Sequence, residues 1–257
     1  MLGRPIGHSL SPALHRAAYA ALGLGWRYDA VDVGEAELPG FLDGLGPEWA
    51  GLSLTMPLKA AVLPLLDEVS DLARDVAAAN TVLLRDGRRW GENTDVPGIV
   101  LALGEAGITS VTRAVVLGGG ATARSALAAL ALLGCRTPVL VVRSTPDRTL
   151  EAADRLGVVP TVVPWSPAVL AGCELLVSTL PPGAADPLAP HVADLPALLD
   201  VVYDPWPTPL AAGCGGVVVS GAAMLLHQAA EQVRLMTGRP APLEAMRQAL
   251  TGRPHQP

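Results

Sequence analysis

The chain has few of the residues that would indicate a metal centre, a disulfide framework or a membrane span. Its three cysteines, Cys135, Cys173 and Cys214, lie far apart and form no C-x-x-C pair. Structural zinc and disulfides are therefore not expected, no metal site is predicted, and a reducing compartment fits. No apolar run reaches the roughly 18 uninterrupted residues that a membrane helix needs. A secretory signal peptide is not expected either, so we expect a cytoplasmic protein without a membrane partner.

Charged and aromatic residues are also scarce. Charged residues make up 16% of the chain, the net charge is −6, and no basic stripe is present, so nucleic acid is not an expected partner. Aromatic residues make up only 4%, so Leu, Val and Ala must build the core. Because half of the 257 residues are hydrophobic, the core is large enough for one large or two modest domains. His8 and His15 have no metal-ligand spacing with an acidic residue, and we interpret both as structural.

The first part of the chain predicts a mixed α/β domain over residues 1–97. Asp86-Gly87, between two apolar runs, is typical of a tight hairpin turn. Periodicity and turn residues predict strands over 26–33, 51–54, 81–84 and 88–90, and helices over 14–22, 59–77 and 97–106.

The pattern changes after this point to short Val/Leu-rich runs separated by helical segments. Strands are predicted over 114–117, 138–142, 158–163, 175–178 and 198–202, with helices over 122–133, 150–156 and 222–236. Alternating apolar strands and helices imply a parallel sheet that is buried on both faces. Residues 98–220 therefore predict a doubly wound nucleotide-binding domain.

A glycine-rich turn follows the first strand of that domain and opens a helix. It contains Gly118, Gly119, Gly120, Ala121 and Thr122. Glycines let the backbone approach a pyrophosphate, and a helix N-terminus favours the negative charge of that group. An ordinary tight strand-to-helix turn is the alternative, but the strand–turn–helix context favours a phosphate-binding loop.

The end of the next strand indicates which dinucleotide binds. An acidic residue there would bind the ribose hydroxyls of NAD, whereas this strand end carries Arg143, Ser144 and Thr145, with Arg148 further along. This composition favours the 2′-phosphate of NADP. Two solvated loop arginines are the alternative.

Lys59 is the first candidate for chemistry. It follows a short apolar strand and Pro57, and it opens the predicted helix over 59–77. The helix dipole opposes a cation near the first turn, so a lysine there has little structural reason to be present. A solvated surface lysine is the alternative.

Ser9 and Ser11 flank Leu10 near the N-terminus. Ser11 is a plausible helix N-cap, with Pro12 at the first helical position. That role does not require Ser9. In an extended segment the two hydroxyls would point the same way and could bind one group together.

Motifs in series over about residues 2–250 resemble those of the shikimate dehydrogenases. They are Gly7-His8-Ser9-Leu10-Ser11-Pro12, Thr55-Met56-Pro57-Leu58-Lys59, Asn80-Thr81, Asn93-Thr94-Asp95, the loop from Val116 to Ala121, Asp200 to Pro205, and Gly221 to Gln228. The resemblance implies two α/β domains with a cleft between them. One is an N-terminal substrate domain, 1–97, completed by the C-terminal helical segment 221–250. The other is a Rossmann-type NADP-binding domain, 98–220.

The resemblance also implies roles for individual residues. Lys59 and Asp95 would be catalytic and would also bind substrate. Substrate binding would further involve Ser9, Ser11, Thr55, Asn80 and Gln228, and the cofactor would contact Val201, Tyr203 and Gly221. Simpler alternatives are a helix cap for Asp95, loop positions for Asn80 and Asn93, and a half-buried core position for Tyr203. We interpret Asp71 as part of a solvated helix face.

The implied activity is the reversible, NADPH-dependent reduction of 3-dehydroshikimate to shikimate by a monomer or homodimer. A quinate or aminoshikimate dehydrogenase and a non-catalytic NADP-binding sensor are alternatives. Members of the family usually begin with a full strand before the Gly-x-Pro-Ile segment, and here only Met1 and Leu2 stand in its place. We therefore expect upstream residues to be missing and leave open whether the chain as written is fully active.

Overall fold

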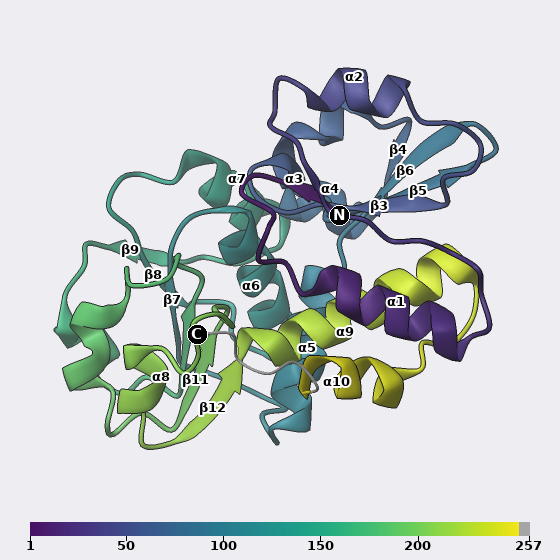
Figure 1. Ribbon diagram of the computed structural model, residues 1–257. Helices are drawn as coiled ribbons and strands as arrows, with labels where there is room; N and C mark the ends of the chain where they lie inside the picture. The colour runs from purple at the N-terminus through teal and green to yellow at the C-terminus, as the bar shows by residue number, and fades with distance from the viewer. Residues whose placement is uncertain (252–257) are drawn as a thin grey trace. The chain divides into compact units, whose positions relative to one another are not determined.

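The computed structural model describes residues 1–251 and divides into two compact units (Figure 1). The first unit contains Met1–Thr94 and the segment from Leu225 onward, and the second unit contains Asp95–Met224. The sequence placed these divisions after residues 97 and 220, a few residues away in each case. Among residues 1–251, no helix has both the length and the apolar character that crossing a membrane would require.

The second unit is built on a six-stranded sheet in which all neighbouring strands run parallel. The strand order is β12-β11-β10-β7-β8-β9, so the order reverses between β7 and β10. This is the doubly wound order of Rossmann-type domains, which bind ligands beyond the carboxyl ends of the strands at that reversal. The strands are β7 (Ala114–Leu117), β8 (Val139–Val141), β9 (Thr161–Val163), β10 (Leu175–Ser178), β11 (Ala197–Asp200) and β12 (Val217–Ser220). The sequence analysis did not predict β12.

Helices and short 3-10 segments connect these strands. They are α5 (Asp95–Glu105), α6 (Ala121–Leu132), α7 (Asp147–Arg155), α8 (Pro209–Gly213), η2 (Pro167–Leu170) and η3 (Asp186–His191). The inward side chains of the central strands, among them Leu117, Leu176 and Leu198, are fully buried. A sheet buried in this way explains the continuous Val/Leu runs in the sequence.

The first unit contains a four-stranded sheet of order β3-β5-β6-β4 and a separate parallel pair, β1-β2. Its strands are β1 (Leu2–Gly3), β2 (Val31–Asp32), β3 (Gly51–Ser53), β4 (Glu68–Val69), β5 (Thr81–Arg85) and β6 (Arg88–Glu92). The β5–β6 hairpin turns at Asp86 and Gly87, both with positive φ, as predicted. Leu2 is buried and bridges to Leu54, so the short N-terminal strand takes part in the fold.

Two predictions for this unit were wrong. The expected helix over 59–77 is divided into α3 (Leu58–Ala61), η1 (Leu63–Leu65), β4 and α4 (Asp71–Val76). Pro64 lacks the N–H that a continuous helix requires, and Glu68–Val69 instead pair with Trp90–Gly91 of β6. The expected strand over 26–33 is reduced to β2.

Helices from both ends of the chain pack together in the first unit. They are α1 (Ser11–Ala21), α9 (Gly221–Thr237), which enters from the second unit, and α10 (Leu243–Thr251); α2 (Leu38–Asp43) lies elsewhere in the unit. Figure 1 shows α1 in purple beside α9 and α10 in yellow. Leu14, Ala18, Ala229 and Val233 form the buried contact between them.

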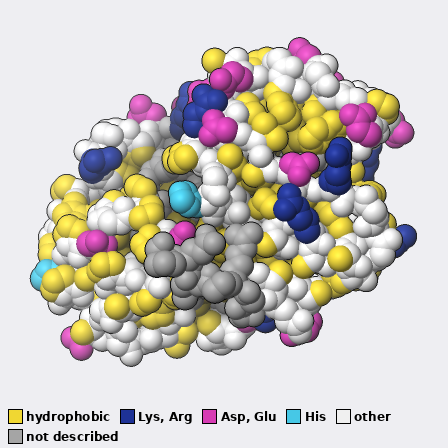
Figure 2. Space-filling view, viewed as in Figure 1, with side chains coloured by type: hydrophobic (Ala, Val, Ile, Leu, Met, Phe, Trp, Pro, Cys, Tyr) yellow, Lys and Arg dark blue, Asp and Glu magenta, His cyan; other side chains and the backbone are white. Residues whose placement is uncertain are grey.

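Charged side chains are spread thinly over the surface. The face in Figure 2 shows Lys and Arg side chains scattered among hydrophobic and uncharged groups, without a broad basic patch. This distribution agrees with the low charge content and the net charge of −6.

Candidate active site

The glycine-rich loop after β7 is packed so closely that side chains would not fit at its first two positions. Gly118 has φ +110, and a Cβ there would lie 2.5 Å from Thr179 Oγ1. A Cβ on Gly119 would lie 3.0 Å from Pro146, whereas Gly120 faces open space. The loop then enters α6 at Ala121. The backbone is therefore accessible at a helix N-terminus, where phosphate groups bind favourably.

Two threonines that the sequence analysis missed hold this loop in place. The Thr149 hydroxyl donates to the Gly119 carbonyl at 2.7 Å, and the Thr179 hydroxyl donates to the Leu117 carbonyl at 2.7 Å. Thr149 comes from α7 and Thr179 follows β10, so both neighbours of the loop help to fix its shape. Neither threonine belongs to a recognisable pattern, and only its neighbours in space reveal its role.

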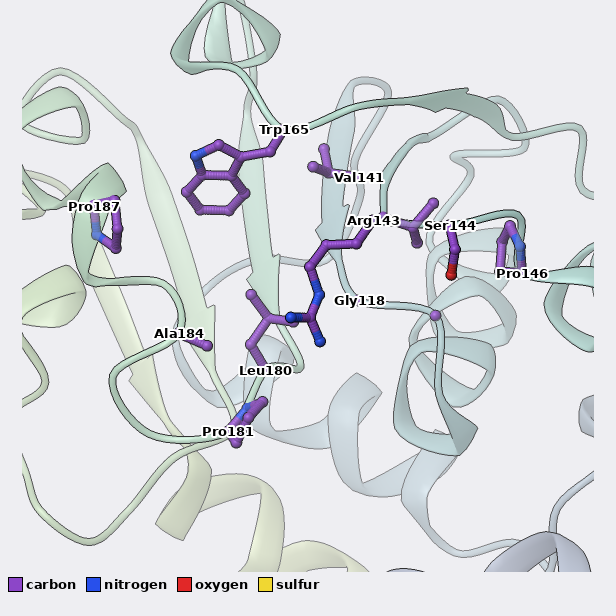
Figure 3. A pocket seen from close by; sticks show the side chains of 12 residues that line it. Gly118, Val141, Arg143, Ser144, Pro146, Trp165, Leu180, Pro181, Ala184 and Pro187 are labelled. Carbon is purple, nitrogen blue, oxygen red and sulfur yellow. The ribbon is translucent and has the colours of Figure 1, made fainter.

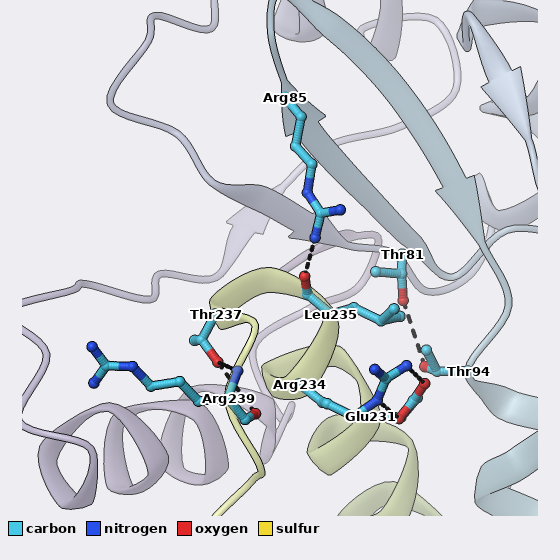
Figure 4. Close-up of polar contacts among 8 residues, drawn as sticks. All are labelled: Thr81, Arg85, Thr94, Glu231, Arg234, Leu235, Thr237 and Arg239. Atoms are coloured by element: carbon cyan, nitrogen blue, oxygen red, sulfur yellow. Dashed lines mark hydrogen bonds and ion pairs between the residues drawn. The ribbon is translucent and has the colours of Figure 1, made fainter.

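A cavity of about 790 Å³ opens beside this loop (Figure 3). One side is polar and includes the Gly118–Gly119 backbone, Arg143 and Ser144. Most of the other lining residues are apolar, among them Val141, Trp165, Leu180, Pro181, Ala184 and Pro187. Figure 3 shows the Arg143 side chain extending into the cavity and the Trp165 indole on its far wall. A cavity of this size with one polar and one apolar side suits a nucleotide.

Arginines cluster next to the first turn of α6. Arg124 is only 4% exposed, and its pKa is lowered by burial first and then by the nearby Arg148 and Arg155. Positive side chains beside a helix N-terminus favour an anion near the glycine-rich loop. Arg148, a predicted cofactor residue, contributes to this field, but neither it nor the exposed Thr145 is among the residues that line the cavity.

Val201 and Gly221 are placed together at the end of β11. The Val201 N–H donates to the Ser178 carbonyl at 3.0 Å. A Cβ on Gly221 would lie 2.0 Å from the Val201 carbonyl oxygen, so only glycine fits where α9 begins. Tyr203, half-buried, lies in the segment that follows.

Asp200 secures the same segment. Its carboxylate accepts hydrogen bonds from the Thr208 hydroxyl at 2.7 Å and from the Val202 N–H at 3.2 Å. Burial raises the pKa of Asp200, while these bonds act in the opposite direction. The segment that carries Tyr203 is therefore held at both ends by one buried carboxyl group.

In the first unit the structure brings Asn80 and Gln228 together, although they are far apart in the sequence. The Asn80 amide donates to Gln228 Oε1 at 3.2 Å and to Thr94 Oγ1 at 2.9 Å, and its oxygen accepts from the Thr94 N–H at 2.8 Å. All three residues are buried. Thr94 was not among the predicted site residues.

The backbone of Lys59 lies next to the group formed by Asn80, Thr94 and Gln228. Its carbonyl accepts the Ala79 N–H at 2.8 Å, directly before Asn80, and its side chain is half-buried. Because α3 is a single turn, Lys59 also belongs to its last turn, so the argument from the helix dipole was wrong. Thr55 precedes this turn and accepts the Leu58 N–H at 2.8 Å. Asp95, buried and the first residue of α5, directly follows Thr94.

The serine pair differs from the prediction in one respect. Leu10, not Ser11, is the N-cap of α1, and the Ser9 hydroxyl accepts the Ser11 N–H at 3.3 Å. The Ser11 hydroxyl is 1% exposed and lies near Tyr28, yet it makes no hydrogen bond of normal geometry among residues 1–251. Leaving a buried hydroxyl without such a bond is costly.

The remaining polar candidates have structural roles or are exposed. His15 is fully buried and hydrogen-bonds to Gln232 and Tyr19, and burial lowers its pKa to about 3. His8 is exposed, and Asp71 pairs with Arg74 on the surface of α4. Within the described part of the chain, no group of three or more His, Cys, Asp or Glu side chains is arranged to hold a metal ion.

Comparison with family models finds matches at both ends of the chain. Residues 1–82 match the shikimate dehydrogenase substrate binding domain, and residues 221–251 match the shikimate 5'-dehydrogenase C-terminal domain. Among curated proteins, the shikimate dehydrogenase (NADP(+)) of Thermus thermophilus is 41% identical over 93% of this chain and 91% of its own length. That of Moorella thermoacetica is 37% identical over 97% of this chain and 91% of its own length.

Solved structures agree with these matches. Shikimate dehydrogenase of Mycobacterium tuberculosis has a TM-score of 0.90 and 44% identity, covering 98% of both chains. The Thermus thermophilus enzyme in complex with NADP(H) and shikimate has a TM-score of 0.85 and 37% identity, covering 97% of both chains. Quinate dehydrogenase of Corynebacterium glutamicum in complex with NAD has a TM-score of 0.86 and 29% identity, covering 98% of this chain and 97% of that chain.

Proposed function

The chain belongs to the shikimate dehydrogenase family, and we propose that it catalyses the reversible reduction of 3-dehydroshikimate to shikimate with NADPH. The observation that carries the choice of cofactor is the cavity in the second unit, where Arg143 extends beside the glycine-rich loop. A guanidinium at the end of the second strand is suited to the 2′-phosphate of NADP, whereas an acidic residue there would favour NAD.

In this proposal the cavity holds the adenine ring and the 2′-phosphate of NADP. Its apolar wall suits the adenine ring, and Arg143 and Ser144 suit the 2′-phosphate. The pyrophosphate would lie along Gly118 to Thr122, next to the field of Arg124 and Arg148. Val201, Tyr203 and Gly221 are proposed to lie toward the nicotinamide. When bound, NADPH supplies the hydride of the reaction.

The residues of the first unit bind the substrate and handle the proton in this proposal. Ser9 and Ser11 hold the carboxylate, which accounts for the buried Ser11 hydroxyl. Thr55, Asn80 and Gln228 bind the ring hydroxyls. Lys59 donates the proton to the forming alkoxide, and Asp95 acts with it. General acid–base help of this kind contributes about 10²–10⁴-fold in rate.

Lys59 has a feature that the sequence analysis did not use. The chain contains 18 Lys and Arg residues, and Lys59 is the only lysine among them. Arginine supplies every other basic side chain, so a position that merely needed positive charge would be expected to carry arginine here as well. An ammonium group can donate a proton and be reprotonated, whereas a guanidinium stays protonated. The single lysine therefore supports a chemical role.

Quinate dehydrogenation is the second candidate, because a quinate dehydrogenase has a fold this similar. That relative was solved with NAD, whereas Arg143 here favours NADP. We further propose domain limits of 1–97 with 221–250 and of 98–220, a cytoplasmic location, and a monomer or homodimer as the active form.

The test is an absorbance assay of NADPH oxidation with 3-dehydroshikimate, with 3-dehydroquinate and with NADH in place of NADPH. We expect the fastest turnover with 3-dehydroshikimate and NADPH. Lys59→Ala and Lys59→Arg should each lower kcat by at least about a hundredfold, while the melting temperature changes little. Asp95→Asn keeps the shape of the side chain and should also lower kcat strongly. Near wild-type turnover in Lys59→Arg would show that only the positive charge matters at this position and would contradict the role of Lys59 as proton donor.

A further inference from the structure

A chain of buried hydrogen bonds passes through Gln232, one helical turn after Gln228 on α9. Gln232 is 1% exposed, and its amide joins two groups of side chains. Its oxygen accepts from the Ser53 hydroxyl at 2.7 Å and lies 3.1 Å from His15 Nε2. Its nitrogen donates to Thr81 Oγ1 at 2.9 Å and to the Asn80 carbonyl at 3.2 Å. The first group, His15 and Ser53, comes from α1 and the end of β3. The second group, Asn80 and Thr81, lies at the start of β5.

The hydrogen bonds of this network can run in only one donor-to-acceptor direction. Because both N–H groups of Gln232 are used by Asn80 and Thr81, the Gln232 oxygen must accept from His15. Neutral His15 therefore carries its proton on Nε2 and accepts the Tyr19 hydroxyl on Nδ1, at 3.2 Å. Ser53 donates to Gln232 and accepts in turn from the Tyr28 hydroxyl at 2.7 Å.

The hydrogen bonds keep the same donor-to-acceptor direction as far as the residues proposed to bind substrate. Thr81 accepts from Gln232, so its own hydrogen is free to point at Asn80 Oδ1, 2.9 Å away. That oxygen also accepts the Thr94 N–H at 2.8 Å. The Asn80 nitrogen must then face the Gln228 oxygen. If the Gln232 donor were lost, Thr81 could reverse its hydrogen bond, and Asn80 Oδ1 would lose the Thr81 hydroxyl as a donor beside the Thr94 N–H.

We propose that Gln232 is a positioning residue that steadies the Asn80 amide, and with it the contact to Gln228, by fixing the hydrogen-bond direction of Thr81. It contacts neither substrate nor cofactor in this proposal, and the consequence for turnover rests on the function proposed above. Replacing Gln232 leaves Asn80 and Gln228 in place, but removes the bond that directs the Thr81 hydroxyl toward Asn80 Oδ1.

Gln232→Met tests this directly, because methionine has a similar shape but donates no hydrogen bond. We expect the KM for shikimate to rise about tenfold while the KM for NADP changes less than about twofold. Gln248→Met is the matched control, since Gln248 is an exposed glutamine on α10 that donates a hydrogen bond to Glu244 of the same helix. It should leave both constants unchanged.

A double-mutant cycle separates positioning from general loosening of the core. If Gln232 acts through Thr81, then adding Gln232→Met to Thr81→Val should change kcat/KM by less than about twofold. Independent, multiplicative effects of the two substitutions would overturn the proposal, as would equal increases in the KM values of both substrates.

Amide hydrogen exchange gives a readout that needs no activity. The Thr94 N–H donates to Asn80 Oδ1, so its protection should fall at least about tenfold in Gln232→Met. The Val111 N–H, bonded to the Leu133 carbonyl in the second unit at 2.9 Å, should keep its protection. Unchanged protection at Thr94 would refute the positioning role. Absence of turnover in the unsubstituted protein would instead refute the proposed function, and exchange would still decide the role of Gln232.

Discussion

Lowering the pH from about 7.5 to about 5 should destabilise the protein in part through the buried side chain of His15. Burial is the main cause that lowers its pKa from 6.5 to about 3, and the hydrogen bond with Gln232 opposes this shift only in part. The folded protein therefore keeps His15 neutral throughout this range. The unfolded chain takes up a proton at the same residue once the pH falls below about 6.5.

The sign and size of the effect follow from this difference. The folded pKa is depressed, so the stability contributed by neutral His15 is complete above about pH 6.5 and is lost as the pH falls. At pH 5 the pH lies about 1.5 units below the pKa of His15 in the unfolded chain, so proton uptake stabilises the unfolded state. Each unit corresponds to about 1.4 kcal/mol. The loss expected from His15 is therefore about 2 kcal/mol, a large share of the stability of an ordinary domain.

Urea unfolding followed by circular dichroism at several pH values measures this loss. His15→Gln should lower stability at neutral pH but should remove about 2 kcal/mol of the pH dependence between these limits. His8→Gln is the matched control, because His8 is exposed, and it should keep the pH dependence of the unsubstituted protein. An unchanged pH dependence in His15→Gln would refute the assignment of the effect to this residue.

Three further predictions concern the second unit. Arg143→Ala should raise the KM for NADPH about tenfold or more and hardly change that for NADH, because a charge-assisted bond to the 2′-phosphate is lost; equal effects on both cofactors in the absorbance assay would contradict this role. Trp165→Leu should weaken the binding of adenosine 2′,5′-bisphosphate by about five- to tenfold in calorimetry, because base stacking on an aromatic wall is lost; the same change at the exposed Trp26 of the first unit should have no effect. Gly221→Ala should destabilise the protein by about 1–3 kcal/mol in urea unfolding, because its Cβ would clash with the Val201 carbonyl. Gly104→Ala, where no atom lies within 4 Å of the new Cβ, should instead stabilise α5 by up to about 1 kcal/mol, and a similar outcome for both glycines would contradict the packing argument.

The second unit was largely predictable from the sequence because its signals are local. Runs such as Ala114–Leu117 and Leu175–Ser178 are buried on both faces, and the glycines between strand and helix mark the turn. The segment 59–77 was not predictable in this way. Leu63, Leu66 and Val69 have helical spacing, but Val69 belongs to a strand whose partner, Gly91, lies elsewhere in the chain. Periodicity within a segment does not reveal a pairing of this kind.

The same distinction between local and distant contacts applies to the candidate site. Gly118 and Arg143 were found because phosphate binding restricts the residue types at these positions, and both line the cavity. Thr149 and Gln232 were missed because their importance comes from hydrogen bonds to Gly119 and Thr81, far away in the sequence. A threonine or glutamine inside a helix has no pattern that marks it. The roles assigned to the substrate residues stay predictions until the variants are measured.

Lys59 shows how a composition can carry information that a motif alone does not. The first reason for noting this residue was its position in a helix, and that reason failed because α3 is a single turn in which Lys59 also occupies the last turn. The stronger reason is that a chain with 18 basic Lys and Arg side chains uses lysine at this position alone. Arginine suits ion pairs and surface charge at least as well as lysine, so those needs do not explain the exception. The proposed proton transfer would account for the exception, because an ammonium group can donate a proton whereas a guanidinium stays protonated.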